Sequence, residues 1–159
     1  MKEQSIKRLE SLIHGMPMGV LVEDGDRKII YVNSVLGIIF GVEPDSLLGQ
    51  DCGGVLESSL PFFVNPEEIK NDVSVLLKAR TVKRGDKVKM KDGRVLVRDY
   101  IPVDFDGVSI GNMWLYQDVT KEMNDLESLT LLNEKMTGRE LKMIELKEEN
   151  AALKKRLGL

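Results

Sequence analysis

The sequence predicts an α+β domain followed by one long helix. Short β-rich runs separated by turn residues occur at residues 19–32 and again at 86–118, and helical patterns lie between these two groups. After Tyr116 the chain has no aromatic residue and no proline, and Asp118–Leu159 is charged with regularly spaced leucines. The length of 159 residues, with 42% hydrophobic and 31% charged residues, fits one globular domain with an extension.

The chain is predicted to begin with a helix and a hairpin. Apolar residues recur at helical spacing in Lys2–His14, and Gly15-Met16-Pro17 ends the pattern, so residues 1–14 are expected to form an amphipathic helix. Gly19–Glu23 and Lys28–Val32 are rich in β-formers, and the Asp24-Gly25-Asp26 sequence between them is a hairpin turn signal.

The middle of the domain is predicted to be helical. Asn33-Ser34 can cap a short helix at Val35–Phe40, and Pro44–Leu48 resembles one further helical turn. Asn65–Lys78 begins with a capping asparagine, a proline and two acids, which is a typical helix start. Asp51–Phe63 shows no regular pattern, because two adjacent glycines and a proline interrupt it.

Three strands are predicted to complete the domain. Asp86–Met90 alternates lysines with apolar residues, and turn residues separate it from Arg94–Val103 and Val108–Asp118. Five strands with helices after the second fit an α+β domain whose helices cover one face of the sheet. The chain is therefore expected to comprise an N-terminal helix (1–14), a domain (15–120) and a helical segment (121–159).

Several short motifs follow one another in an order that carries a family resemblance. They are Gly19–Gly25, Ile29–Asn33, Phe40-Gly41, Leu47–Gly49, Lys91–Gly93 and Asp118–Thr120. Together they resemble a PAS domain over residues 12–120. The resemblance implies a five-stranded antiparallel sheet with a pocket under its helices, and a sensory role that often depends on a bound small molecule. It also implies that Asp118 and Thr120 couple the domain to the following helix, whereas the alternative for Asp118 is a plain helix cap.

Cys52 raises the question of a flavin cofactor. The resemblance places it where the flavin-binding light sensors of the family carry their reactive cysteine, but the residues that follow differ from theirs. The positions of the flavin-contacting amides hold Val88, Arg98 and Tyr116, and Gln117 is one place too late. We expect no flavin, and we expect Cys52 to be a small buried residue.

A haem cofactor is not expected either. Haem-binding relatives take a histidine from the helix at Asn65–Lys78, which has none, and the only histidine of the chain is His14. Ligation by methionine or cysteine stays open, so the identity of any cofactor or ligand is left unknown.

The candidate pocket residues depend on the register of the fourth strand. In the register that the resemblance implies, Leu96, Arg98 and Tyr100 face the pocket, with Trp114 and Tyr116 beside them. Cys52 is a further candidate pocket residue. Arg98 would then need an internal carboxylate or the acidic group of a ligand. A shift by one residue exposes Arg98 and buries its valine neighbours instead, and the alternation of those valines favours this shifted register.

The C-terminal segment has the spacing of a coiled-coil seam. The seam residues, which alternate in steps of three and four, are Leu129, Leu132, Met136, Arg139, Met143, Leu146, Asn150, Leu153 and Leu157. Asn150 at an a position is typical of a parallel two-stranded coiled coil. Gly138 and Arg139 interrupt the pattern. The expected state is a parallel homodimer, and the alternative is a helix folded back on its own domain.

Composition argues against several classes of function. The net charge is −3, and residues 121–159 contain eight basic and eight acidic residues, so neither nucleic acid nor a membrane surface is an expected partner. No basic stretch precedes the seam, as DNA binding would require. No residue pattern resembles a catalytic or metal site, so no enzymatic activity is expected. Without a membrane span or a signal peptide, a cytoplasmic protein is expected.

These observations predict a sensory and dimerisation module for signal transduction. A change of ligand or of core packing would alter the parallel coiled coil, and a downstream signalling protein or an effector domain would respond to it. The alternative is a ligand-free structural adaptor that uses the same fold only to form a homodimer and to recruit a partner.

Overall fold

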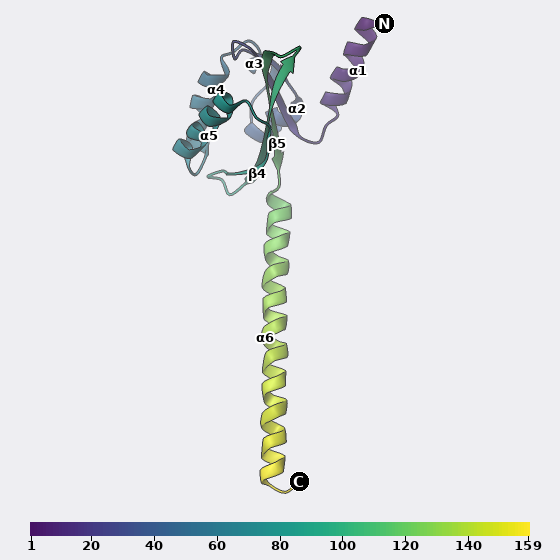
Figure 1. The fold of residues 1–159 in the computed structure, drawn as a ribbon, viewed down its shortest axis with the longest axis vertical. Helices are drawn as coiled ribbons and strands as arrows, with labels where there is room; N and C mark the ends of the chain where they lie inside the picture. The colour runs from purple at the N-terminus through teal and green to yellow at the C-terminus, as the bar shows by residue number, and fades with distance from the viewer. The chain divides into compact units, whose positions relative to one another are not determined.

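The computed structural model describes residues 1–159, and the chain divides into two compact units, Met1–Thr120 and Lys121–Leu159. The first unit begins with α1 (Lys2–His14), β1 (Gly19–Asp24) and β2 (Ile29–Val32), as labelled in Figure 1. A helix is present where it was predicted near the N-terminus, and it begins at Lys2 and ends at His14. None of its side chains is buried, so its apolar stripe is exposed in this structure.

Four helices and one 3-10 turn follow the first hairpin. Their bounds are α2 (Ser34–Phe40), α3 (Pro44–Leu47), α4 (Cys52–Ser59), the 3-10 helix η1 (Leu60–Phe62) and α5 (Pro66–Ala79). Asn33 caps α2 as predicted, because its side-chain oxygen accepts a hydrogen bond from the backbone N–H of Leu36. Gly41 ends α2 in the left-handed conformation, with a φ of 66° that a residue without a Cβ adopts freely.

The helix α4 was not predicted. Asp51 caps it by accepting a hydrogen bond of 2.9 Å from the backbone N–H of Gly54, which satisfies a free donor in the first turn. Gly53 and Gly54 lie in that first turn, where the cap offsets the low helix propensity of glycine. At the start of α5, by contrast, the predicted cap is not formed: Asn65 occupies the cap position, but its side chain makes no capping hydrogen bond.

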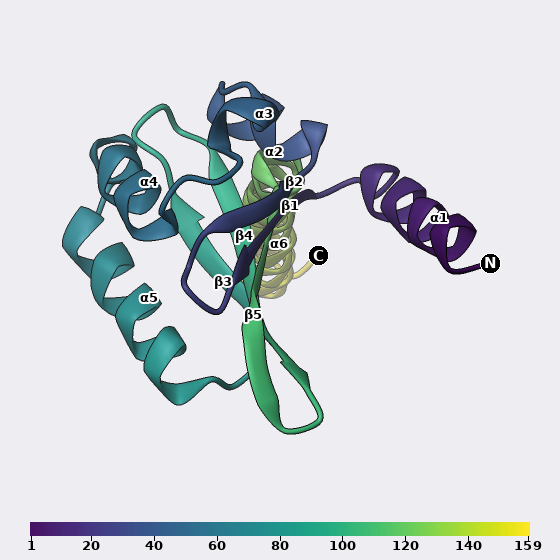
Figure 2. The ribbon, with the colours of Figure 1, turned by 90° about the horizontal axis from the view of Figure 1, so that it is seen from above.

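The sheet has five antiparallel strands, as predicted. β3 (Lys83–Lys89), β4 (Val95–Phe105) and β5 (Val108–Asp118) complete it, and the strand order is β2-β1-β5-β4-β3. The strand β5 is therefore central, with β1 and β4 as its neighbours. The helices α4 and α5 lie along one face of the sheet (Figure 2), which we call the covered face.

The register of β4 corrects one sequence-based prediction. Leu96, Arg98 and Tyr100 are buried, whereas Val95 and Val97 are only half-buried, so the shifted register that the valines favoured is wrong. The side chains of the buried set point to the covered face, beside the buried face of β5. Burial of an arginine is feasible there because two carboxylates accompany it, as described below.

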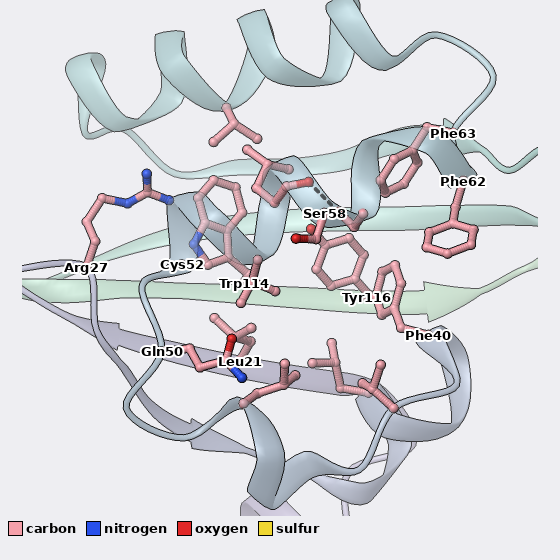
Figure 3. Close-up of a pocket in the computed structure, with 17 residues that line it drawn as sticks. Leu21, Arg27, Phe40, Gln50, Cys52, Ser58, Phe62, Phe63, Trp114 and Tyr116 are labelled. Atoms are coloured by element: carbon pink, nitrogen blue, oxygen red, sulfur yellow. Dashed lines mark hydrogen bonds between the residues drawn. The ribbon is translucent and has the colours of Figure 1, made fainter.

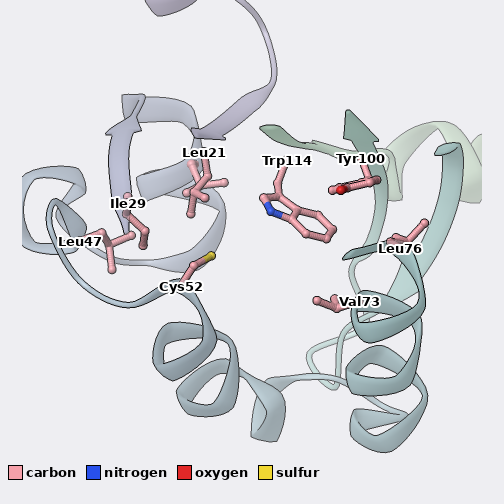
Figure 4. Packing of buried hydrophobic residues seen from close by; sticks show 9 residues of the cluster. Leu21, Ile29, Leu47, Cys52, Val73, Leu76, Tyr100 and Trp114 are labelled. Carbon is pink, nitrogen blue, oxygen red and sulfur yellow. The ribbon is translucent and has the colours of Figure 1, made fainter. Parts of the chain in front are cut away.

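The core lies between the covered face and the helices. Two clusters of buried apolar residues share it, one around Trp114 and Leu21 (Figure 4) and the other around Leu96 and Phe63. The apolar stripe predicted for α5 supplies Val73 to the first cluster and Ile69 to the second. Burial of these stripes holds the helices on the sheet.

The second unit is occupied by α6 (Thr120–Arg156), which has no buried residue. Its apolar seam is exposed over its whole length, from Leu129 to Leu157. The structure contains one copy of the chain, so the coiled coil stays a prediction. No helix combines the length and the apolar character that crossing a membrane requires.

Candidate functional site

A cavity of about 260 Å³ lies between the covered face of the sheet and the helices. The sheet contributes Leu21 from β1 and Trp114 and Tyr116 from β5. Arg27 lies in the turn between β1 and β2, and the helices α2 to α5 with their connections contribute the rest of the wall, which is mainly apolar. The predicted pocket residues Cys52, Trp114 and Tyr116 therefore come together around one cavity.

The two ends of the cavity differ in chemistry (Figure 3). Arg27, Gln50 and Cys52 lie at one end, and we call this the polar end. Phe40, Phe62, Phe63 and Tyr116 lie at the other, which we call the aromatic end; there, the rings of Phe40 and Tyr116 meet edge to face with centroids 5.2 Å apart. A ligand with a polar group on an apolar body would match this arrangement.

Cys52 is a buried, protonated thiol at the polar end. It is the first residue of α4, a position that by itself favours a thiolate. Burial outweighs this effect and raises the pKa of the thiol, and the nearby Glu23 carboxylate raises it further against the influence of Arg27. The prediction of a small buried residue is confirmed, and the protonated thiol is a poor nucleophile.

A buried polar network, which the sequence analysis did not predict, borders this end of the cavity. Glu23 is fully buried and accepts hydrogen bonds from Arg27 Nε (3.2 Å) and Asn112 Nδ2 (2.7 Å). Tyr100 donates its hydroxyl hydrogen to Asn112 Oδ1 (2.7 Å), so it belongs to the network and does not line the cavity. The signal that could have located Glu23 is its position two residues after Leu21, on the same face of the strand.

Arg27 holds the turn between β1 and β2 against the network. Its φ of 63° is unusual for a residue with a side chain, and its guanidinium pairs with Glu23. Burial would lower the pKa of Arg27, but hydrogen bonding and attraction to Glu23 outweigh it, so the pKa is raised. The cation beside the cavity is thus already neutralised by a carboxylate.

Arg98 also lies outside the cavity wall. Its guanidinium is 1% exposed, donates a short hydrogen bond to Asp86 of β3, and lies 3.8 Å from a carboxylate oxygen of Asp72 in α5. The internal carboxylates that a buried arginine needs are therefore present. An acidic ligand is not required to explain its burial.

One buried side-chain nitrogen of the cavity wall has no partner. Trp114 is 4% exposed, and its indole nitrogen Nε1 is buried without a hydrogen-bond acceptor. In Figures 3 and 4 this nitrogen lies on the edge of the ring turned towards Cys52. A buried donor without a partner is uncommon in folded proteins.

The Asp118–Thr120 motif connects the end of β5 to the start of β4. Asp118 Oδ1 accepts hydrogen bonds from the backbone N–H (3.0 Å) and the hydroxyl of Thr120. The Thr120 hydroxyl oxygen accepts in turn from the backbone N–H of Val95 (3.0 Å), and the Val119 N–H donates to the Val95 carbonyl (2.9 Å). The first residue of α6 is thus fixed to two strands, which is more than a plain helix cap provides.

The four positions that were compared with the amide residues of a flavin site differ in their surroundings. Val88 and Arg98 are buried on the covered face, Tyr116 lines the cavity, and Gln117 is exposed. Neither a valine nor a carboxylate-paired arginine offers the amide pattern of a flavin site. No group of three or more His, Cys, Asp or Glu side chains is placed to hold a metal ion.

Comparisons with known proteins agree with this fold. Residues 7–76 match the PAS domain family. No curated protein sequence matches the chain. The PAS domain of a protein from Colwellia psychrerythraea is 18% identical, with a TM-score of 0.53, covering 73% of this chain and 98% of that one. An RNA-binding light-oxygen-voltage receptor is 18% identical, with a TM-score of 0.59 and coverages of 85% and 39%.

A third similar structure is a sensory box sensor histidine kinase from Vibrio cholerae, with 14% identity, a TM-score of 0.50 and coverages of 74% and 94%. Identities this low establish the fold and no more. The family match includes the first hairpin, α2 to α4 and most of α5, and β3 to β5 complete the same five-stranded sheet. Taken together, the family match and the shared fold show that this chain contains a PAS domain.

Proposed function

We propose that the chain is a cytoplasmic sensory and dimerisation module that transmits the occupancy of its cavity to the helix α6. A small molecule in the cavity is the signal, and a downstream signalling protein or an effector domain responds to the state of α6. The sensory role is in keeping with the sensor histidine kinase among the similar structures. We propose no catalytic activity and no nucleic-acid or membrane partner, since the residues around the cavity form no catalytic arrangement.

The observation that carries this proposal is the position of β5. The strand supplies Trp114 and Tyr116 to the cavity wall and ends at Asp118, only two residues further along the same face. Asp118 binds Thr120, the first residue of α6. A ligand that repacks the two aromatic rings therefore acts on the strand that holds the start of the helix.

The coupling is a shift between two populations of the molecule. A ligand favours the arrangement that it binds more tightly, by no more than its difference in affinity for the two. Coupling energies between sites in proteins are typically about 1–3 kcal/mol, which corresponds to roughly 5- to 150-fold in an equilibrium constant. A change of that size in the pairing of α6 is enough for a partner to detect.

The output is proposed to be a parallel homodimer of α6. The seam residues Leu146 and Leu153 are about half exposed in the single chain, and Asn150 lies between them. Pairing with a second copy would bury this seam, and the two asparagines could bond to each other across the axis. A helix of this length with an exposed apolar seam gains most of its stability from such packing.

Ligand retention tests the sensory role. The full chain is purified without denaturation and analysed by native mass spectrometry, and its melting temperature is measured across a library of metabolites. We expect either a co-purified small molecule or a metabolite that raises the melting temperature. A dimer that carries no ligand and responds to no metabolite would instead support the ligand-free adaptor.

A further inference from the structure

The indole nitrogen of Trp114 is the one buried side-chain hydrogen-bonding atom of the cavity wall that lacks a partner. The other buried atom in this condition, Arg98 Nε, lies outside the wall. A donor in such a place gains a hydrogen bond only if something in the cavity accepts it. The indole N–H has donor capacity alone, so the missing partner must be an acceptor.

Apart from the Tyr116 hydroxyl and the Cys52 thiol, the remaining polar groups of the wall already have partners. Arg27 pairs with Glu23 across 3.2 Å. Gln50, Ser58 and Ser59 donate to backbone oxygens in or next to their own helices. These groups therefore do not compete with Trp114 as the principal donor to a ligand.

The cavity offers no free charge to an ionic ligand. The only ionised side chain in its wall is that of Arg27, whose charge is balanced by Glu23. Burial raises the pKa of the Cys52 thiol and of the Tyr116 hydroxyl, so both groups stay neutral at physiological pH. A charged ligand would lose its hydration without gaining an opposite charge in return.

The volume limits the size of the ligand. A buried apolar cavity of about 150 Å³ in another protein holds one benzene ring. The present cavity of about 260 Å³ is larger by more than half and has aromatic side chains at one end. It therefore accommodates a molecule of about two fused rings, smaller than most drug-sized ligands.

We propose that the cavity takes an uncharged, mostly apolar molecule of about two fused rings, whose hydrogen-bond acceptor binds Trp114 Nε1. The acceptor lies near the polar end, and the apolar body extends towards Phe40 and Phe63 at the aromatic end. This inference rests on the proposed function, which assigns the cavity to a ligand, and it specifies the class of that ligand.

Two probes of equal shape test the acceptor. Quinoline has one ring nitrogen that accepts a hydrogen bond, and naphthalene has none. Trp114 is the only tryptophan of the chain, so its indole N–H gives a single assignable signal in a nitrogen-15 NMR spectrum. We expect quinoline to move this proton signal downfield, as hydrogen bonding does, and naphthalene to produce no such downfield shift.

Affinities are measured in the same titrations from the methyl signals of Leu56 and Val73, which line the cavity. One hydrogen bond changes a binding constant by roughly 2- to 10-fold, so the full chain should prefer quinoline to naphthalene by that factor. In Trp114→Phe this preference should disappear, so that quinoline and naphthalene bind with about equal affinity. In the control Tyr116→Phe, which removes a different polar group from the wall, it should persist.

Three outcomes would overturn the inference. Equal affinity for the two probes, without a quinoline-specific shift of the indole proton, refutes the acceptor but leaves a ligand-binding cavity in place. Binding of the anion 1-naphthoate as tightly as naphthalene refutes the requirement for an uncharged ligand. Failure of both neutral probes to bind refutes the ligand class, while the search for a retained ligand still decides the proposed function.

Discussion

Arg98 shows, at the scale of a single residue, how distant partners decide a local arrangement. Its neighbours Val95 and Val97 occupy every second position of the strand, and this pattern alone predicts that the arginine is exposed. The structure buries it because Asp86 and Asp72, from β3 and α5, meet its guanidinium. Those carboxylates are remote in sequence, so a strand pattern contains no information about them.

Removal of Arg98 tests the role of this buried ion pair. We expect Arg98→Ala to lower the free energy of unfolding by about 3 kcal/mol, because it leaves the poorly hydrated Asp86 carboxylate without its main partner. Arg84→Ala is the matched control, since Arg84 forms a surface ion pair: its side chain is 66% exposed, and its guanidinium lies 3.6 Å from a carboxylate oxygen of Asp99. It should cost less than about 1 kcal/mol. Similar small losses for both variants in urea denaturation would contradict a structural role for Arg98.

Cys52 makes the stability of the domain depend on pH in the alkaline range. The unfolded thiol ionises from about its ordinary pKa of 9.0, whereas burial keeps the folded thiol protonated. The folded state then holds more protons than the unfolded state, so stability falls as pH rises above this value. Between pH 8 and pH 10 the wild type should lose about 1.4 kcal/mol more than Cys52→Ala.

Urea denaturation at the two pH values measures this difference directly, because the tyrosines are common to both proteins. Equal losses in the wild type and in Cys52→Ala would mean that the folded thiol ionises normally. That result would place Cys52 in a solvent-accessible site and would contradict its burial.

At the scale of the elements, the local patterns predicted most of the fold. The strands and the helices α1, α2 and α5 follow from turn residues, caps and apolar spacing, all of which are local in sequence. The helix α4 was missed because its two glycines disfavour a helix, while the cap by Asp51 and the packing of Val55 and Leu56 favour it. Packing of that kind appears only once the sheet is in place.

Only part of the candidate site was predicted, because some of its contacts join residues that are remote in sequence. Cys52, Trp114 and Tyr116 were placed around a pocket by the family resemblance, and they do line one cavity. The hydrogen bond between Glu23 and Asn112 joins residues 89 positions apart, so no local signal revealed that network. The unpartnered indole nitrogen likewise depends on what surrounds it in space.

The junction between β5 and α6 gives a prediction for an element boundary. Thr120→Val keeps the shape of the side chain but removes the oxygen that accepts from the Val95 N–H. We expect the Val95 amide to exchange with solvent about fivefold or more faster, as the loss of roughly 1 kcal/mol implies. Thr120→Ser retains the hydroxyl and should preserve the slow rate. Unchanged exchange in Thr120→Val would show that this hydrogen bond does not hold the junction.

At the scale of the whole molecule, Asn150 is predicted to set the oligomeric state. Asn150→Ile should tighten self-association and admit species larger than a dimer, because the buried asparagine specifies two strands at a cost in stability. Glu148→Ile, placed away from the seam, should behave like the wild type. Light scattering and sedimentation equilibrium report both properties. A wild type that stays monomeric at tens of micromolar would contradict the pairing of α6.

The most direct test of the sensory mechanism is the dissociation constant of that dimer with the cavity empty and filled. Quinoline fills the cavity from outside, and Val55→Phe fills part of it from within. We predict that at least one of them changes the constant by fivefold or more in sedimentation equilibrium, and that Thr120→Val abolishes the change. If the cavity is filled by both routes and the dissociation constant stays the same within twofold, occupancy is not transmitted to α6 and the sensory mechanism is wrong.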